Sequence, residues 1–99
     1  MANELEVFWT VRATHDFEKI FFYLKSNWSE KEITNFINKL NKAVNLISYR
    51  PKLFTLTNFR KNLRRCVLTK QTTIFYKEVD SKIYIVSLHD NRKNPVSAP

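Results

Sequence analysis

The sequence contains no glycine, although average usage of about 7% predicts roughly seven in a chain of this length. Gly-rich loops that cradle phosphates and dinucleotide-binding fingerprints are therefore excluded. Backbone positions that need a positive φ must instead be occupied by Asn or Asp, which tolerate the left-handed region better than other residues.

Cysteine and histidine are also scarce, with one Cys and two His. A single cysteine rules out an internal disulfide and fits a reducing compartment, so we expect a cytoplasmic protein. Cys66 lies within a strand pattern and is expected to be a small buried hydrophobe. So few potential ligands argue against a metal site, and no cofactor is predicted. No apolar run approaches the length of a membrane span, and the N-terminus has no basic leader, so no membrane partner is expected.

The net charge of +8 comes entirely from the second half of the chain. Residues 1–49 carry six basic and six acidic side chains, whereas residues 50–99 carry eleven basic and three acidic ones. A basic half of this kind suits a polyanionic partner, either a nucleic acid or an acidic protein segment. The alternative is a solvated basic face that serves solubility.

The first half of the chain predicts a strand followed by two helices. Residues 5–11 alternate between two faces, as in a half-buried strand. An apolar stripe at helical spacing predicts a helix over 12–27. Ser29 and Glu32 form a capping box at the start of a second helix, which must end before Pro51. The short link between the helices predicts an antiparallel hairpin.

The second half predicts strands separated by short turns, over residues 53–56, 64–69, 73–79 and 82–88. The fold class is therefore α+β, with the helical hairpin on one face of a three- to four-stranded, mostly antiparallel sheet. The other face is expected to be partly exposed. A length of 99 residues suits a single domain, 1–99, in which 93–99 form an irregular tail.

The last predicted strand is apolar on both faces, which is typical of a central strand. Strict alternation places Ile83 and Ile85 on one face and Tyr84, Val86 and Leu88 on the other.

Basic side chains gather before and within the strand at 64–69. We predict target or nucleic-acid contacts from Arg60, Lys61, Arg64, Arg65 and, near the C-terminus, Lys93. Because successive residues of a strand point to opposite faces, Arg64 and Arg65 are not expected to reach the same ligand unless a bulge intervenes.

A second candidate cluster combines Lys70, His89 and Arg92. In an antiparallel meander the end of the last strand lies beside the turn that precedes Thr73, so these three side chains are predicted to converge there. Such a cluster could grip a phosphodiester and stabilise its developing charge, with His89 as general acid or base. A purely structural histidine at a strand end is favoured over a catalytic one.

The order and spacing of several motifs resemble the RelE/ParE superfamily of bacterial toxins. The resemblance covers roughly residues 5–95. It is carried by Ala13 and Asp16, by Trp28-Ser29, by Pro51, and by the segments Leu63-Arg64-Arg65-Cys66-Val67-Leu68, Ile74-Phe75-Tyr76, Ile83-Tyr84-Ile85-Val86 and Asp90-Asn91-Arg92-Lys93-Asn94-Pro95.

The resemblance implies the toxin of a type II toxin–antitoxin, plasmid stabilisation-like system, neutralised by a cognate antitoxin. RelE-like members cleave mRNA on the ribosome, and Lys70 and Arg92 match basic residues of that group. ParE-like members act on DNA gyrase and are not nucleases. The segment from Asn94 to Pro99 has no Tyr or His where many of the nucleases keep one, and the helical hairpin is long. We therefore expect a ParE-like toxin, with a RelE-like endoribonuclease as the alternative.

A third reading, independent of toxicity, is a basic module that binds nucleic acid or protein through the second half of the chain. Growth on induction without an antitoxin separates it from both toxins.

Overall fold

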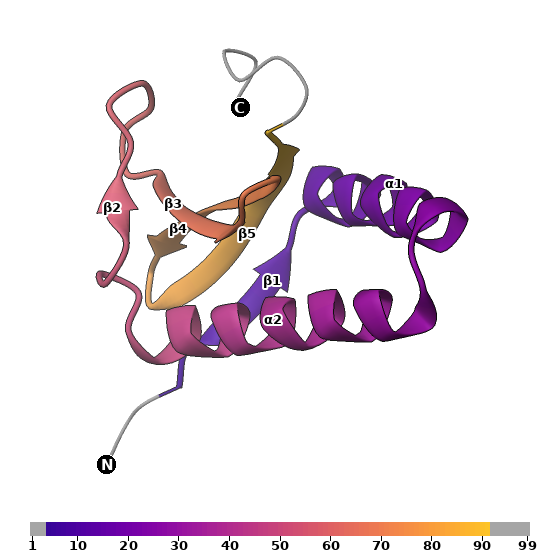
Figure 1. The fold of residues 1–99 in the computed structure, drawn as a ribbon. Helices are drawn as coiled ribbons and strands as arrows, with labels where there is room; N and C mark the ends of the chain where they lie inside the picture. The colour runs from indigo at the N-terminus through magenta and orange to yellow at the C-terminus, as the bar shows by residue number, and fades with distance from the viewer. Residues whose placement is uncertain (1–3, 92–99) are drawn as a thin grey trace.

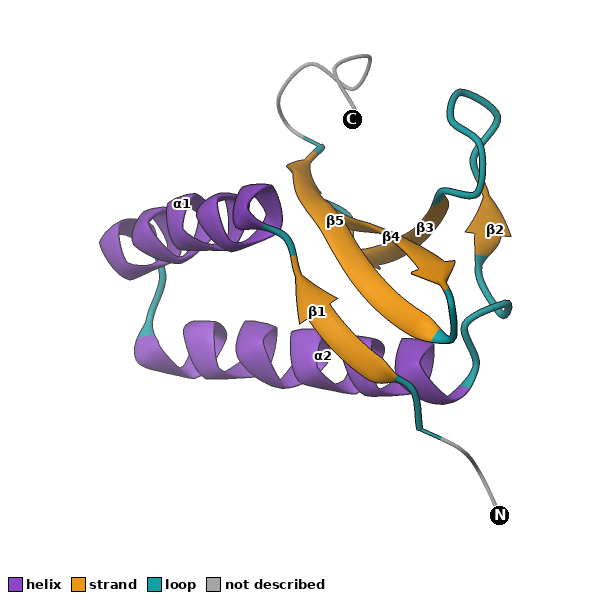
Figure 2. Ribbon diagram, turned by 180° about the vertical axis from the view of Figure 1, so that it is seen from behind, coloured by secondary structure: helices purple, strands orange, loops and turns teal. Residues whose placement is uncertain are grey.

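The computed structural model describes residues 4–91. It contains two helices and five strands in the order β1 (Glu6–Trp9), α1 (Val11–Asn27), α2 (Glu30–Tyr49), β2 (Thr55–Leu56), β3 (Arg64–Thr69), β4 (Thr72–Val79) and β5 (Lys82–Asp90). The five strands form one sheet in the order β1-β5-β4-β3-β2, and the two helices lie side by side against it (Figures 1 and 2). The predicted α+β class is confirmed.

Local sequence signals set the ends of both helices. The side chain of Thr10 accepts a hydrogen bond from the backbone N–H of Ala13 and so caps α1. The predicted capping box of α2 is present, because Ser29 and Glu32 each accept a bond from the other's backbone N–H. These bonds satisfy N–H groups that have no partner within the helix.

The sheet is antiparallel except at one edge. β2, β3, β4 and β5 pair antiparallel with their neighbours, whereas β1 runs parallel to β5 and pairs Phe8 with Tyr84. The turn between β4 and β5 has positive φ at Asp80 and Ser81, and Asn62 has a third positive φ. Asn62 and Asp80 are residue types expected at such positions, whereas Ser81 is not.

The core lies between the helices and one face of the sheet. It joins Ala13 and Leu24 of α1, Phe36, Leu40 and Ile47 of α2, and Cys66, Ile74, Tyr76, Ile83, Ile85 and Leu88 of the sheet. The buried position predicted for Cys66 is confirmed, and burial raises the pKa of its thiol.

One expectation about the last strand is wrong. Leu88 lies on the core face with Ile83 and Ile85, because the register between β4 and β5 shifts by one residue at Val86. Such a bulge reverses the alternation beyond it. As a result Ser87 and His89 lie on the face of the sheet that points away from the helices.

Candidate functional site: the second face of the sheet

The sheet face opposite the helices carries the exposed basic residues of β3 and β4. Register pairing brings Arg65 beside Phe75 and Ser87, and it brings Thr73 beside His89. We call this surface the second face. The residues at its centre are buried: Phe75 is 4% exposed and Ser87 is 1% exposed.

Phe59 covers part of this centre. It comes from the connection between β2 and β3, and its ring packs edge-on against Phe75 with 5.9 Å between the centroids. Phe59 itself remains 51% exposed, and Val67 on the same face is 65% exposed. The second face therefore presents apolar side chains to solvent beside its basic ones, a combination that suits binding to a macromolecule.

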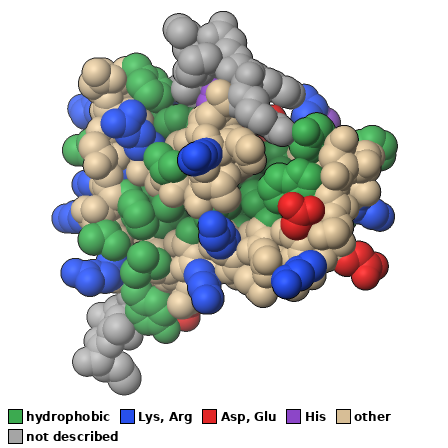
Figure 3. Space-filling model, in the orientation of Figure 1, with side chains coloured by type: hydrophobic (Ala, Val, Ile, Leu, Met, Phe, Trp, Pro, Cys, Tyr) green, Lys and Arg blue, Asp and Glu red, His purple; other side chains and the backbone are tan. Residues whose placement is uncertain are grey.

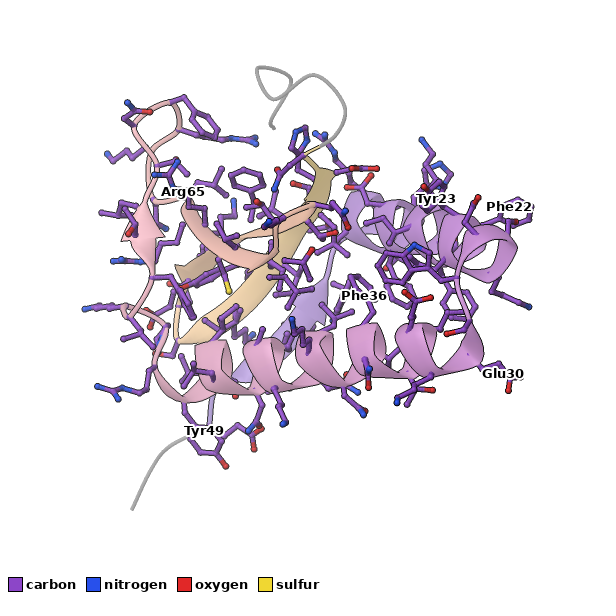
Figure 4. All side chains as sticks on the ribbon, in the orientation of Figure 1. Phe22, Tyr23, Glu30, Phe36, Tyr49 and Arg65 are labelled. Carbon is purple, nitrogen blue, oxygen red and sulfur yellow. The ribbon has the colours of Figure 1, made fainter. Side chains whose placement is uncertain are left out.

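Arg64 and Arg65 point in opposite directions, as strand alternation predicts. Nη1 of Arg64 donates a hydrogen bond to the backbone carbonyl of Phe54 at 2.7 Å, and to that of Lys52 at 3.5 Å. Arg64 thus holds the segment after α2 against the sheet. Arg65 is exposed at the β2 side of the sheet, remote from the helices (Figure 4). Of these two arginines, only Arg65 has the placement of a target contact.

Arg60 and Lys61 are also exposed, in the same connection as Phe59. The turn that holds them is fixed at both ends. The side chain of Thr57 donates to the carbonyl of Arg60 at 3.1 Å, and the N–H of Thr57 donates to the carbonyl of Leu63 at 2.7 Å. In Figure 3 the left flank of the molecule, over β2 and this connection, is mainly basic, and the acidic side chains in view lie mostly towards the helices.

A buried tyrosine, Tyr76, bonds to the chain segment that leads from α2 to β2. Tyr76 is fully buried, and its hydroxyl donates a hydrogen bond to the carbonyl of Pro51 at 2.7 Å. Burial raises the pKa of Tyr76 to about 12, although the nearby charge of Arg64 acts in the opposite direction. Tyr76 therefore holds the chain that leads to β2 in place.

The end of β5 is tied to the turn between β3 and β4. The backbone N–H of Asn91 donates to the carbonyl of Gln71 at 2.6 Å, and its side-chain amide donates to the carbonyl of Lys70 at 3.3 Å and to the hydroxyl of Thr73 at 3.0 Å. Lys70 is exposed in this turn. The predicted proximity of His89 to Thr73 and of this strand end to Lys70 is confirmed, whereas Arg92 and Lys93 lie outside the described residues.

His89 is half-buried, and its ring packs edge-on against Phe75 with 6.4 Å between the centroids. Its Nε2 atom is buried and, among the described residues, has no hydrogen-bond partner. The same is true of Oγ of Ser87, two residues earlier on the same face. A buried Nε2 is poorly placed to exchange a proton with a large substrate.

Two residues of the site were not singled out from the sequence as functional. Asn91 organises the turn that carries Lys70. Asp16 of α1 accepts a hydrogen bond from the backbone N–H of Leu88 at 3.1 Å, which fixes β5 beside His89. Asp16 also lies 3.7 Å from Arg12, four residues earlier on α1. The sequence spacing of Arg12 and Asp16 indicates that local pair, but it does not indicate the hydrogen bond between Asp16 and the distant Leu88.

Within residues 4–91, no three His, Cys, Asp or Glu side chains come together in a way that could hold a metal ion. In the same range, neither helix is long and apolar enough to cross a membrane.

Comparison with known families gives a match, over residues 7–95, to the ParE toxin of the type II toxin-antitoxin system parDE. The chain belongs to the ParE toxin family. No curated protein matches the sequence.

Solved structures agree with this assignment at the level of the fold. The structure resembles the chromosomal ParDE toxin–antitoxin system of P. aeruginosa, with a TM-score of 0.74 at 11% identity, covering 88% of this chain and 96% of that one. It also resembles the DinJ-YafQ toxin-antitoxin complex of E. coli, with a TM-score of 0.63 at 12% identity, covering 91% and 96%. For the YoeB dimer of Staphylococcus aureus the TM-score is 0.61 at 17% identity, covering 88% and 97%.

Proposed function

We propose that this ParE-family protein is a toxin that inhibits growth by binding DNA gyrase and is neutralised by a cognate antitoxin. The observation that carries the proposal is the family match across residues 7–95, which spans both helices and all of the sheet beyond the first residue of β1.

The second face supports binding rather than catalysis. Arg60, Lys61 and Arg65 are exposed beside the exposed apolar side chains of Phe59 and Val67. Interfaces commonly combine aromatic anchors with arginine in this way. We therefore assign this surface as the contact with the target, and its charge suits a partner that presents acidic groups.

A gyrase supercoiling assay with the purified toxin tests the target. The toxin should inhibit supercoiling, and Arg65→Glu should weaken the inhibition because it places a negative charge at the centre of the contact. Lys19→Glu is the matched control, since it makes the same charge change at an exposed position on α1. Unaltered supercoiling at toxin concentrations that stop growth would refute the gyrase proposal.

The alternative is a RelE-like endoribonuclease that cleaves mRNA on the ribosome. What supports it is that His89 pairs with Thr73 and that the side chain of Asn91 donates to the carbonyl of Lys70 at the same end of the sheet. Primer extension on mRNA from induced cells tests it. Cleavage within codons that disappears in His89→Gln and Lys70→Ala would establish the nuclease, and intact mRNA in growth-arrested cells would eliminate it.

We also propose that the antitoxin neutralises the toxin with acidic residues that lie against the basic second half of the chain. The product of a small reading frame next to the toxin gene is the protein to test. Co-expression of that product should restore growth, and Arg65→Glu should weaken the complex. Normal growth of cells that express this protein alone would instead favour a non-toxic binding module.

A further inference from the structure

The parallel strand β1 forms an open edge of the sheet. Among the strands that the structure describes, it lies at one end of the order, and β5 is its single neighbour. Figure 2 shows β1 in front of α2 with no strand on its outer side. Proteins usually blunt such edges, since unpaired backbone groups attract another strand.

The backbone of β1 shows which groups face outwards. The N–H of Thr10 donates to the carbonyl of Ile85 in β5 at 3.1 Å, so Thr10 points inwards. In a parallel pair, alternate residues direct both N–H and C=O to the same side. Phe8 therefore also faces β5, whereas Val7 and Trp9 direct their N–H and C=O groups outwards. Because β1 is the edge strand, these outward groups have no neighbouring strand among the described residues.

The length of this open edge is limited at both ends. The N–H of Leu5 is already bonded to the carbonyl of Ser48 in α2 at 3.0 Å. At the other end the chain enters α1 at Val11. Two residues with outward-facing groups, Val7 and Trp9, remain available, and they offer four hydrogen-bonding groups over about 10 Å of strand.

Two hollows adjoin this edge and share Trp9 and Asn41. The first, of about 440 Å³, lies between β1 and α2 and has a mixed lining that includes Glu4, Glu6, Val44 and Ser48. The second, of about 270 Å³, lies where β1 meets the two helices. Its lining is almost wholly apolar and includes Phe17, Ile37 and Leu40.

We propose that an extended segment of the antitoxin pairs with the outer edge of β1 as a sixth strand, an inference that rests on the proposed toxin function. Side chains opposite Val7 and Trp9 point to the same side as those residues, towards α2. The residue opposite Trp9 is a large apolar anchor for the second hollow. Two positions away, the residue opposite Val7 is small or polar, because it meets Asn41 and Asn45.

Charge distinguishes this segment from the rest of the antitoxin. Glu4 and Glu6 line the first hollow, and among the described residues no Lys or Arg lines it, although Lys82 of β5 lies opposite Glu6 in the sheet. The strand that lies there carries Lys or Arg near that end, although the antitoxin surface that meets the basic second half of the toxin is acidic. We therefore expect the antitoxin sequence to contain an extended segment with one large apolar residue, a small or polar residue two positions away, and a Lys or Arg beside them.

The occupant is the antitoxin rather than a second copy of this chain. Antiparallel pairing of β1 with another β1 places Val7 opposite Trp9, so the apolar hollow receives a valine that each copy already packs against its own core. Two molecules of charge +8 also repel each other.

The test uses the full-length toxin and the protein encoded by the adjacent small reading frame. Amide exchange followed by NMR should show the N–H groups of Val7 and Trp9 slowed by about tenfold or more in the complex, as expected for new strand bonds. Val7→Pro removes an outward donor but no bond to β5, and it should weaken the complex by about tenfold. Leu56→Pro is the matched control, because it removes an outward donor at the opposite edge, in β2, and it should leave the slowed exchange at Val7 and Trp9 in the complex unchanged.

The outcomes separate the two levels of the proposal. A complex that forms with unchanged exchange at Val7 and Trp9 overturns the strand pairing but leaves the toxin assignment intact. Failure of the neighbouring protein to bind or neutralise the toxin overturns both. Slow exchange at these two amides in the toxin alone, increasing with toxin concentration, shows a contact between copies and overturns the antitoxin as occupant.

Discussion

The buried hydroxyl of Tyr76 gives the structure a defined response to alkali. Its hydrogen bond to the carbonyl of Pro51 is 2.7 Å long, and a bond of this kind contributes about 1 kcal/mol net. Tyr76→Phe should therefore lower the free energy of unfolding by about 1 kcal/mol near neutral pH. For a domain of this size the melting temperature should fall by about 4–8 °C.

The same hydroxyl should reverse the sign of that difference at high pH. Burial raises the pKa of Tyr76 from 10.0 to about 12 in the folded protein. A group with a raised folded pKa contributes its full stability below the unfolded pKa and loses it as pH rises through the folded value. Wild-type stability should thus decline between about pH 10 and 12, by a total on the order of 3 kcal/mol once the hydroxyl is ionised in both states.

Urea unfolding of the wild type and of Tyr76→Phe across this pH range gives the difference in their free energies of unfolding. That difference reports both the lost hydrogen bond and the ionisation of the hydroxyl. The wild type should be the more stable by about 1 kcal/mol at about pH 8 and the less stable by about 2 kcal/mol above pH 12, since other ionising groups cancel in the comparison. Tyr49→Phe, which removes an exposed hydroxyl, controls for the loss of a phenol as such. A difference that stays constant from pH 10 to 12 would refute the reasoning.

Three further predictions concern other contacts described above. Asp16→Ala should lower the free energy of unfolding by about 2 kcal/mol in urea titrations, because it leaves the Leu88 N–H without its charged acceptor. Arg64→Met should destabilise the protein by about 1–2 kcal/mol, because Arg64 bonds the carbonyl of Phe54. Arg65→Ser should change stability by less than about 0.5 kcal/mol and should instead reduce toxicity, because Arg65 is exposed. Equal melting temperatures for the two variants would contradict this division. Cys66 should react slowly with a thiol reagent in the native protein and rapidly in denaturant, and fast native labelling would show that the thiol is not buried.

Most of the fold follows from signals that are local in the sequence. The Ser29 capping box fixed the start of α2, and alternation located β3 at the residues where the structure has it. These features depend on neighbours a few residues apart, so periodicity and capping rules detect them. The parallel pairing of β1 with β5 depends on contacts between distant residues, and no local rule indicates which edge of the sheet an isolated strand joins.

The candidate site was predicted less completely, for two physical reasons. The bulge at Val86 reverses the alternation of β5, and nothing in the residue types of this apolar strand announces it. The second reason is that the charge of a side chain does not indicate which face of the sheet it lies on. Arg64 and Arg65 are adjacent and identical, yet one binds backbone carbonyls and the other is exposed. Strand alternation predicted that the two side chains point to opposite faces. It could not predict that the carbonyls of Lys52 and Phe54 bind Arg64, because that contact depends on the tertiary fold.

The pairing of the first strand with the last has a consequence for how the protein is made. β1 ends at Trp9 and its partner β5 begins at Lys82, so residues 10–81 are synthesised between the two strands. At about 5–20 residues per second, synthesis of the intervening segment takes several seconds, during which β1 has no strand to join. Truncated products that stop before β5 lack the strand that joins β1 to β4. We therefore expect a copy of this ParE-family protein that terminates before β5 not to fold.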